Sequence, residues 1–255
     1  MELCDSHGHI QMLEGGEREA VLERAAAAGV AAILVPGTTL SDSRLAVELA
    51  ESRAGLHAAV GVHPHETAGF DADRVLPELS DLCESKAVVA VGEIGLDFHY
   101  DHSPRQDQIR AFESQLDFAA QRGLPVLLHN RESGLVMLEI LRGRSRRERP
   151  GLFHSFTESA QFGLDAIALG YKISFSGMIT FKAADNIRRA AAALPLDDLL
   201  VETDAPFLSP VPHRGKPCEP AFVIETARKL AQVQGVSLED VGRATTATFR
   251  GLFFP

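Results

Sequence analysis

The sequence predicts an α/β fold, a single-domain (β/α)8 TIM barrel that uses the whole chain, residues 1–255. Short apolar runs bounded by Gly or Pro recur at roughly even spacing, as buried parallel strands do, and amphipathic helical stretches lie between them. A chain of 255 residues with 45% hydrophobic residues has the usual size of one such barrel. No linker or low-complexity tract interrupts the alternation, so we expect one domain.

Eight apolar segments are expected to be strands, which pair in parallel through right-handed helical crossovers. In chain order they are Leu3–His9, Ala31–Gly37, Leu56–His63, Ala87–Gly95, Leu124–Asn130, Gly151–Phe156, Lys172–Gly177 and Leu199–Asp204. Helical periodicity predicts helices that include Glu17–Ala28, Ser41–Ser52, Pro104–Arg122, Ser133–Leu141, Ser159–Leu169, Ala184–Ala193 and Pro220–Gln234. Ser103 before Pro104 resembles a helix N-cap followed by Pro in the first turn.

Metal-capable side chains stand at the ends of five of these expected strands. They are His7, His9, Glu93, His129, His154 and Asp204. A barrel gathers the carboxyl ends of its strands at one mouth, so we expect these side chains to converge. Imidazole and carboxylate donors suit Zn²⁺ and Mn²⁺, while Mg²⁺ prefers carboxylate oxygen and water. Six donors are enough for two divalent ions, whose identity among Mg²⁺, Zn²⁺ and Mn²⁺ stays open.

His7 and His9 are two residues apart, so on a strand both side chains project to the same side. Taken alone, this pair fits core or surface histidines hydrogen-bonded to neighbours equally well. The four further positions favour the metal interpretation. We expect one ion on His7, His9 and Asp204, a second on His129 and His154, and Glu93 bridging them. Glu93 and Asp204 are the expected catalytic residues, with Asp204 orienting or deprotonating the attacking water.

Asp5 and Glu202 lie one alternation before these ligands, where each carboxylate would accept the second N–H of a ligand histidine. A simple cap or a buried hydrogen-bond partner is the equal alternative for both.

Several motifs together resemble the TatD family of metal-dependent deoxyribonucleases, amidohydrolase-like barrel enzymes, over nearly the entire chain. The matching stretches are Asp5–His9, Gly61–His65, Val91–Asp97, His129, His154–Phe156, Ser174–Gly177, Glu202–Pro206 and Pro212–Lys216. The resemblance implies hydrolysis of phosphodiester bonds in DNA, commonly by a Mg²⁺-dependent exonuclease that trims 3′ ends. The resemblance also implies that residues 1–255 form one TatD-like metallohydrolase barrel. The chain departs from the family at Gln11 and Thr248, where Asp and Asn are usual, and at Cys218, where Asn is usual.

The resemblance also implies that His63 contacts substrate phosphate, although a structural hydrogen bond is the alternative. His65, on the loop after Pro64, and Arg214, after the last strand, are further candidates for substrate binding. Tyr100, in the polar stretch with Asp97, His99 and His102, could stack on a base or belong to an ordinary loop.

The formal net charge of −10 argues against general adhesion to nucleic acid through the surface field. A basic cluster precedes the sixth strand and consists of Arg142, Arg144, Arg146, Arg147 and Arg149. This position in the barrel places the cluster at the face opposite the expected site. We therefore interpret it as a solvated helix end. Three scattered cysteines suit reduced thiols in a cytoplasmic protein, and no run is long enough to span a membrane.

These observations predict a divalent-metal-dependent hydrolase with two ions, DNA as substrate, no obligate protein partner and a monomeric state. The alternative is a metal-dependent hydrolase of amides or esters, acting on a small molecule or an aminoacyl-tRNA. Related barrels of that kind often carry a carboxylated Lys at the end of strand four, where this chain has Glu93. A metal-holding scaffold without turnover is a second alternative.

Overall fold

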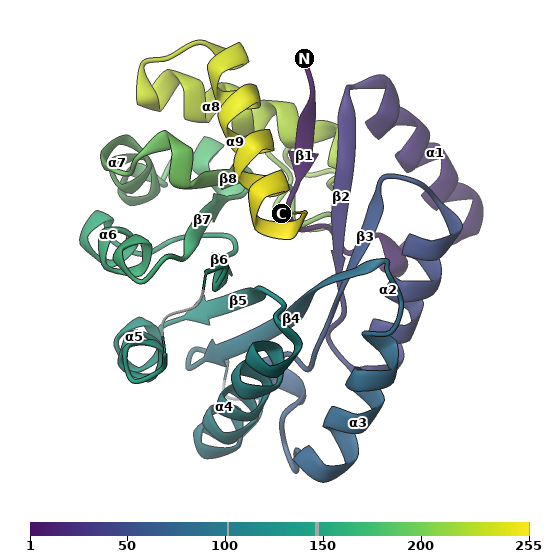
Figure 1. Ribbon diagram of the computed structural model, residues 1–255. Helices are drawn as coiled ribbons and strands as arrows, with labels where there is room; N and C mark the ends of the chain where they lie inside the picture. Colours follow the sequence, from purple (N-terminus) through teal and green to yellow (C-terminus); the bar gives the residue numbers. More distant parts are fainter. Residues whose placement is uncertain (101, 146–147, 255) are drawn as a thin grey trace. The chain divides into compact units, whose positions relative to one another are not determined.

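The computed structural model describes residues 1–100, 102–145 and 148–254 (Figure 1). Its eight strands follow one another in chain order in one sheet, the connectivity of the predicted (β/α)8 barrel. They are β1 (Leu3–Asp5), β2 (Val30–Pro36), β3 (Leu56–Val60), β4 (Val88–Asp97), β5 (Val126–Arg131), β6 (Gly151–Phe153), β7 (Lys172–Phe175) and β8 (Leu199–Val201). The fold class is therefore the one that the strand and helix alternation predicts.

Helices alternate with the strands along the chain. The α-helices are α1 (Gly15–Ala27), α2 (Leu40–Ser52), α3 (Ala72–Leu82), α4 (Arg105–Arg122), α5 (Gly134–Arg142), α6 (Ala160–Ala168), α7 (Asp185–Ala193), α8 (Val223–Gln234) and α9 (Leu238–Phe253). Short 3-10 helices are η1 (Ile10–Met12), η2 (Pro64–Glu66), η3 (Gly177–Thr180), η4 (Leu196–Asp198) and η5 (Pro220–Phe222). Of these, α3 and α9 were not among the stretches named from helical periodicity.

Several strands end earlier than their apolar runs predict. β1 ends at Asp5 and β8 at Val201, so His9 and Asp204 lie beyond the strands rather than on them. β4 differs in the other direction, because it continues to Asp97. The expected cap at Ser103 is also wrong. The N-cap of α4 is Pro104 without a side-chain bond, and the Ser103 hydroxyl instead donates to the carbonyl of His65.

Contacts divide the chain into two compact units. The first unit contains Met1–Leu34, His154–Ile167 and Lys172–Pro255. In it β1 pairs with the start of β2 and β7 pairs with β8, both in parallel. Its core includes fully buried side chains of these strands, among them Ile173, Phe175 and Val201. Beyond β1, the amide of His9 donates to the carbonyl of Ala205 at 2.7 Å, which ties the segment after β1 to the segment after β8.

The second unit contains Val35–Phe153 and Ala168–Tyr171. Here β3, β4, β5 and β6 lie side by side as parallel neighbours (Figure 1). All ten residues of β4 are buried. Gly95 has a φ of +148°, and a Cβ at this position would lie 2.0 Å from the carbonyl oxygen of His129. Only glycine permits this conformation and close approach, which brings β4 against the part of β5 that carries His129.

Within the described ranges, no helix is both long and apolar enough to cross a bilayer. Cys4, Cys83 and Cys218 are free thiols.

Candidate metal centre

The first unit brings together metal-capable side chains from the segments that directly follow β1, β6 and β8, which we call the His7 cluster. Its members are His7, His9, His154, Glu202 and Asp204. The Nε2 atoms of His7 and His9 are 3.1 Å apart, and Asp204 Oδ1 lies 3.5 Å from the first and 3.6 Å from the second. The ring of His154 stacks on His7, with centroids 4.0 Å apart. The rings of His7 and His9 therefore converge on one carboxylate.

These distances fit a bound cation. Donors about 2.0–2.1 Å from a tetrahedral Zn²⁺ are separated from one another by about 3.3 Å. The three edges of the triangle formed by His7, His9 and Asp204 are of this size. Burial opposes ionisation of Asp204, but a hydrogen bond from His9 and the charges of nearby histidines together lower the pKa of its carboxyl. The triangle thus offers an ionised carboxylate with two imidazole nitrogens, a donor set suited to Zn²⁺ or Mn²⁺.

Two further carboxylates support the His7 cluster. Glu202 is fully buried, and its Oε1 lies 3.3 Å from His154 Nδ1 and accepts the amide of Ser155 at 2.8 Å. This is the position expected of a carboxylate that orients a ligand histidine. Asp5 instead accepts the main-chain amides of His7 and Thr203 and the Thr203 hydroxyl. Burial raises the pKa of Asp5 to about 7, although the Thr203 and His7 bonds oppose the rise. Asp5 thereby joins the ends of β1 and β8.

The second unit holds another group of donors, from β4, β5 and the segment after β3, which we call the His129 cluster. Its members are His63, His65, Glu93, Asp97 and His129. Glu93 Oε1 lies 3.0 Å from His129 Nδ1 and 3.4 Å from His63 Nε2. Asp97 Oδ2 lies 3.1 Å from His129 Nε2 and 2.8 Å from His65 Nε2. The two carboxylates therefore face opposite nitrogens of the same imidazole ring.

Asp97 belongs to this cluster, although its position in a polar stretch of the sequence equally fits an ordinary loop. It is fully buried, at the last position of β4. Burial opposes ionisation, yet hydrogen bonds from His129, Tyr100 and His65 hold its pKa well below the usual range. The signal that could have found it is spacing, because Glu93 and Asp97 are four residues apart and an extended strand directs both to one side.

His63 and His65 were expected to bind substrate, and the structure places both in the His129 cluster. Burial lowers the pKa of His63 to about 4, so its ring is neutral at pH 7, the form that coordinates metal. His65 also contacts Tyr100, with ring centroids 5.7 Å apart. Tyr100 is 49% exposed, and the Arg131 guanidinium lies 4.5 Å from its ring centroid.

Arg214, the third expected substrate contact, lies on the loop after β8. Its guanidinium lies 3.8 Å from the centre of the Phe181 ring and donates to the carbonyl of Ser209 at 2.8 Å. These contacts hold the loop, and a role toward substrate stays a prediction.

The positions at which the chain departs from the family pattern have packing roles here. Cys218 is buried, and its amide donates to the carbonyl of Pro206. The Thr248 hydroxyl lies 3.0 Å from the carbonyls of both Asp197 and Ala244. Gln11 is buried and follows His9 by two residues. Its main-chain carbonyl accepts a hydrogen bond from the Arg18 guanidinium.

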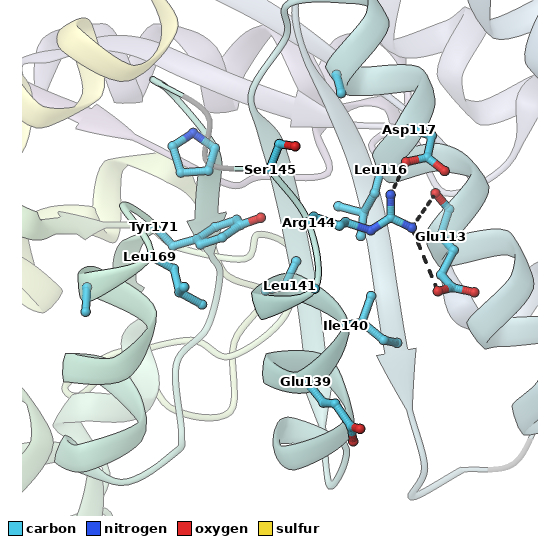
Figure 2. Close-up of a pocket in the computed structure, with 14 residues that line it drawn as sticks. Glu113, Leu116, Asp117, Glu139, Ile140, Leu141, Arg144, Ser145, Leu169 and Tyr171 are labelled. Atoms are coloured by element: carbon cyan, nitrogen blue, oxygen red, sulfur yellow. Dashed lines mark hydrogen bonds and ion pairs between the residues drawn. The ribbon is translucent and has the colours of Figure 1, made fainter.

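A cavity of about 720 Å³ in the second unit contains none of these donors (Figure 2). It lies between α4 and α5 near the start of β6, with Leu116, Ile140 and Tyr171 among its lining residues. Figure 2 shows Arg144 extended toward α4, where its guanidinium binds Asp117 and the carbonyl of Glu113. Its charge is therefore compensated, in keeping with a structural role. Arg146 and Arg147 lie outside the described residues.

A parallel β/α fold that carries two clusters of imidazole and carboxylate donors at the ends of its strands is typical of metal-dependent hydrolases. The model of one such family, described as TatD related DNase, matches residues 4–254. The chain belongs to this family and is a metal-dependent hydrolase.

Relatives and solved structures agree with this assignment. The chain is 36% identical to an uncharacterized metal-dependent hydrolase, YcfH of Escherichia coli, over 99% of this chain and 96% of that protein. It is 33% identical, over 93% of each chain, to a protein of Erwinia amylovora named as the 3′-5′ ssDNA/RNA exonuclease TatD. The crystal structure of YJJV, a TatD homologue from Escherichia coli, superposes with a TM-score of 0.92 at 34% identity, covering 98% of this chain and 97% of that one.

Proposed function

We propose that this hydrolase cleaves phosphodiester bonds in DNA and removes nucleotides from the 3′ end. The observation that carries the proposal is the pair of donor clusters, one at His7 and one at His129. Two divalent cations suit attack on a phosphodiester, because one can face the attacking oxygen and the other the leaving oxygen. The similarity to the Erwinia amylovora exonuclease supports a nucleic-acid substrate.

The residues present fit two cations. His7, His9 and Asp204 would hold the first cation, and Glu93 and His129 would hold the second. His154 lies in the His7 cluster, so its assignment to the second cation, like the bridging role of Glu93, stays a prediction. When bound, such cations would supply Lewis acidity toward phosphate and a hydroxide at neutral pH.

The protein's own groups would position the reaction. Asp204 is ionised at neutral pH, since its pKa is lowered, and can accept a proton from the attacking water. The carboxylates of Glu202 and Asp97 hold the rings of His154 and His129 in place. Because the chain has a net charge of −10, attraction of DNA would depend on the cations at the site rather than on the general surface.

The first test is hydrolysis of a 5′-labelled single-stranded oligonucleotide by the metal-loaded protein, beside a panel of amides and esters. We expect a ladder of products shortened from the 3′ end. His129→Ala should abolish hydrolysis, because it removes the imidazole that lies between Glu93 and Asp97 and would bind the second cation. The variant is expected to remain folded. His57→Gln, at a half-buried histidine of β3 outside both clusters, is the matched control.

Two results would contradict the proposal. Unchanged nuclease rate in His129→Ala would exclude the His129 cluster from the reaction. Turnover of amides or esters with none of any nucleic acid would favour the small-molecule hydrolase instead.

A further inference from the structure

Phe207 is an aromatic side chain placed beside the His7 cluster and left open to solvent. It follows Asp204 by three residues, and its exposed fraction is 51%. Its ring centroid lies 6.1 Å from that of His9, at an interplanar angle of 73°. Single exposed apolar residues are common, so exposure alone explains nothing. The position next to two candidate metal ligands is what gives this ring a possible role.

The turn that carries Phe207 is held in a strained conformation on both sides of the ring. Asp204 has a φ of +60° and Leu208 a φ of +51°, in the left-handed region that a leucine rarely adopts. The Phe207 amide donates to the carbonyl of Asp204 at 2.7 Å, which closes the turn. Such strain persists only where surrounding contacts enforce it, and it concentrates at functional sites.

Those contacts come from neighbouring segments of the same unit. A Cβ at Gly177 would lie 2.3 Å from the carbonyl oxygen of Leu208, so the backbones of η3 and the turn approach closely. The amide of Val211 donates to the Thr180 hydroxyl at 2.9 Å, and the amide of Cys218 donates to Pro206 at 2.9 Å. The backbone around Phe207 is thus fixed in advance, while its ring remains available. Presenting a ring in this way lowers the entropy lost on binding.

We propose that Phe207 stacks against the nucleobase of the nucleotide whose phosphate is bound at the His7 cluster. This inference rests on the proposed nuclease function. The Phe207 ring centroid lies 6.1 Å from that of His9, close enough for one nucleotide to reach from a phosphate at the cluster to this ring. Stacking on an aromatic ring tolerates every base, which suits the proposed removal of successive nucleotides from a 3′ end. It also adds affinity in an acidic protein whose surface does not attract DNA.

Tyr100, beside the His129 cluster, is less suited to this role. The guanidinium of Arg131 lies over its ring, and the ring of His102 is nearly parallel to it at 5.6 Å. The exposed fractions of Tyr100 and Phe207 are similar, but Phe207 meets the ring of His9 edge to face, so the geometry favours Phe207.

The absence of tryptophan from the sequence provides a direct test. Phe207→Trp keeps a stacking ring and makes it the single tryptophan of the protein. The metal-loaded variant is titrated with a single-stranded oligonucleotide whose 3′ linkages are phosphorothioates, which resist hydrolysis. A second oligonucleotide has the same length and linkages, but its last two nucleotides are abasic. We expect base-containing DNA to quench the tryptophan fluorescence and the abasic DNA to leave it unchanged. Val211→Trp, on the same loop and 47% exposed, is the matched control and should not be quenched.

A kinetic comparison uses Phe207→Ala, with Phe207→Tyr as the conservative variant. Loss of one stacked base weakens binding by roughly fivefold to 150-fold. We therefore expect KM for base-containing DNA to rise by this factor in Phe207→Ala, with kcat little changed and with Phe207→Tyr close to the unaltered protein. The abasic substrate should show no such difference between the variants.

The outcomes separate this inference from the nuclease proposal. If Phe207→Trp hydrolyses and binds DNA but both oligonucleotides affect its fluorescence equally, the stacking role is wrong and the nuclease function stands. If the unaltered protein neither binds nor cleaves any nucleic acid, both proposals fail.

Discussion

At the scale of the residue, His129 shows how one imidazole can serve two partners. Its Nδ1 faces Glu93 at 3.0 Å and its Nε2 faces Asp97 at 3.1 Å. A neutral imidazole has one N–H and one lone pair, so only one of these nitrogens can bind a cation. If Nδ1 binds metal with Glu93, then Nε2–H donates to the ionised carboxylate of Asp97. Asp97 would act as a positioning residue for the ring.

We predict that Asp97→Asn weakens binding of a divalent cation by about 10–100-fold, because an amide is a poorer acceptor for the His129 N–H. Calorimetric titration with Zn²⁺ or Mn²⁺ measures the change. Asp81→Asn, at an exposed position on α3, should leave the affinity unaltered. Equal affinity in the two variants would show that Asp97 does not position His129.

At the scale of the element, β4 depends on Gly95. We predict that Gly95→Ala lowers the free energy of unfolding by about 2–4 kcal/mol, because the new methyl group would meet the His129 carbonyl at 2.0 Å in a backbone conformation that alanine avoids. Denaturant unfolding measures the loss. Gly251→Ala, in α9 with open space around the position, should be neutral or slightly stabilising. A similar stability for both variants would contradict the close approach of β4 and β5.

Strands and helices could be located from the sequence, but some of their ends could not. The apolar runs beginning at Leu3 and Leu56 predict the starts of β1 and β3 correctly. Both expected strands continue past the last paired residue, because the chain stays buried over Ser6–His9 and Gly61–His63 after it has left the hydrogen-bonded ladder. In contrast, β4 extends to a carboxylate, Asp97, because histidines compensate its buried charge. A polar residue at the end of an apolar run is therefore ambiguous until its partners are known.

The members of the two donor clusters could be predicted only in part. The sequence groups His7, His9 and Asp204 because strand ends converge in a parallel barrel, and the structure has these three side chains within 3.6 Å of one another. The association of His63 and His65 with the His129 cluster was not predicted. It depends on η2, a short helix that turns both rings toward β4 and β5. Spacing in the sequence carries no record of that turn.

At the scale of the whole molecule, each compact unit contains a donor set of its own. The His7 cluster lies entirely in the first unit and the His129 cluster entirely in the second. Each offers at least three nitrogen or oxygen donors whose atoms lie within 4.8 Å of one another. Three protein ligands are the usual number for a catalytic cation that keeps an open position for water or substrate. Neither unit therefore needs donors from the other to hold one ion.

We predict that the unaltered protein binds about two divalent ions per chain and that loss of either cluster leaves about one. Elemental analysis after gel filtration is expected to give this result for His7→Ala/His9→Ala and for His129→Ala. His99→Ala, at an exposed histidine paired with Glu132, should keep both ions. A chelator should also lower the Tm of the unaltered protein, since a cation present at 100 times its Kd stabilises the folded state by about 2.7 kcal/mol. Loss of both ions from a single-cluster variant would contradict independent sites and would instead indicate that one ligand, such as Glu93, couples them.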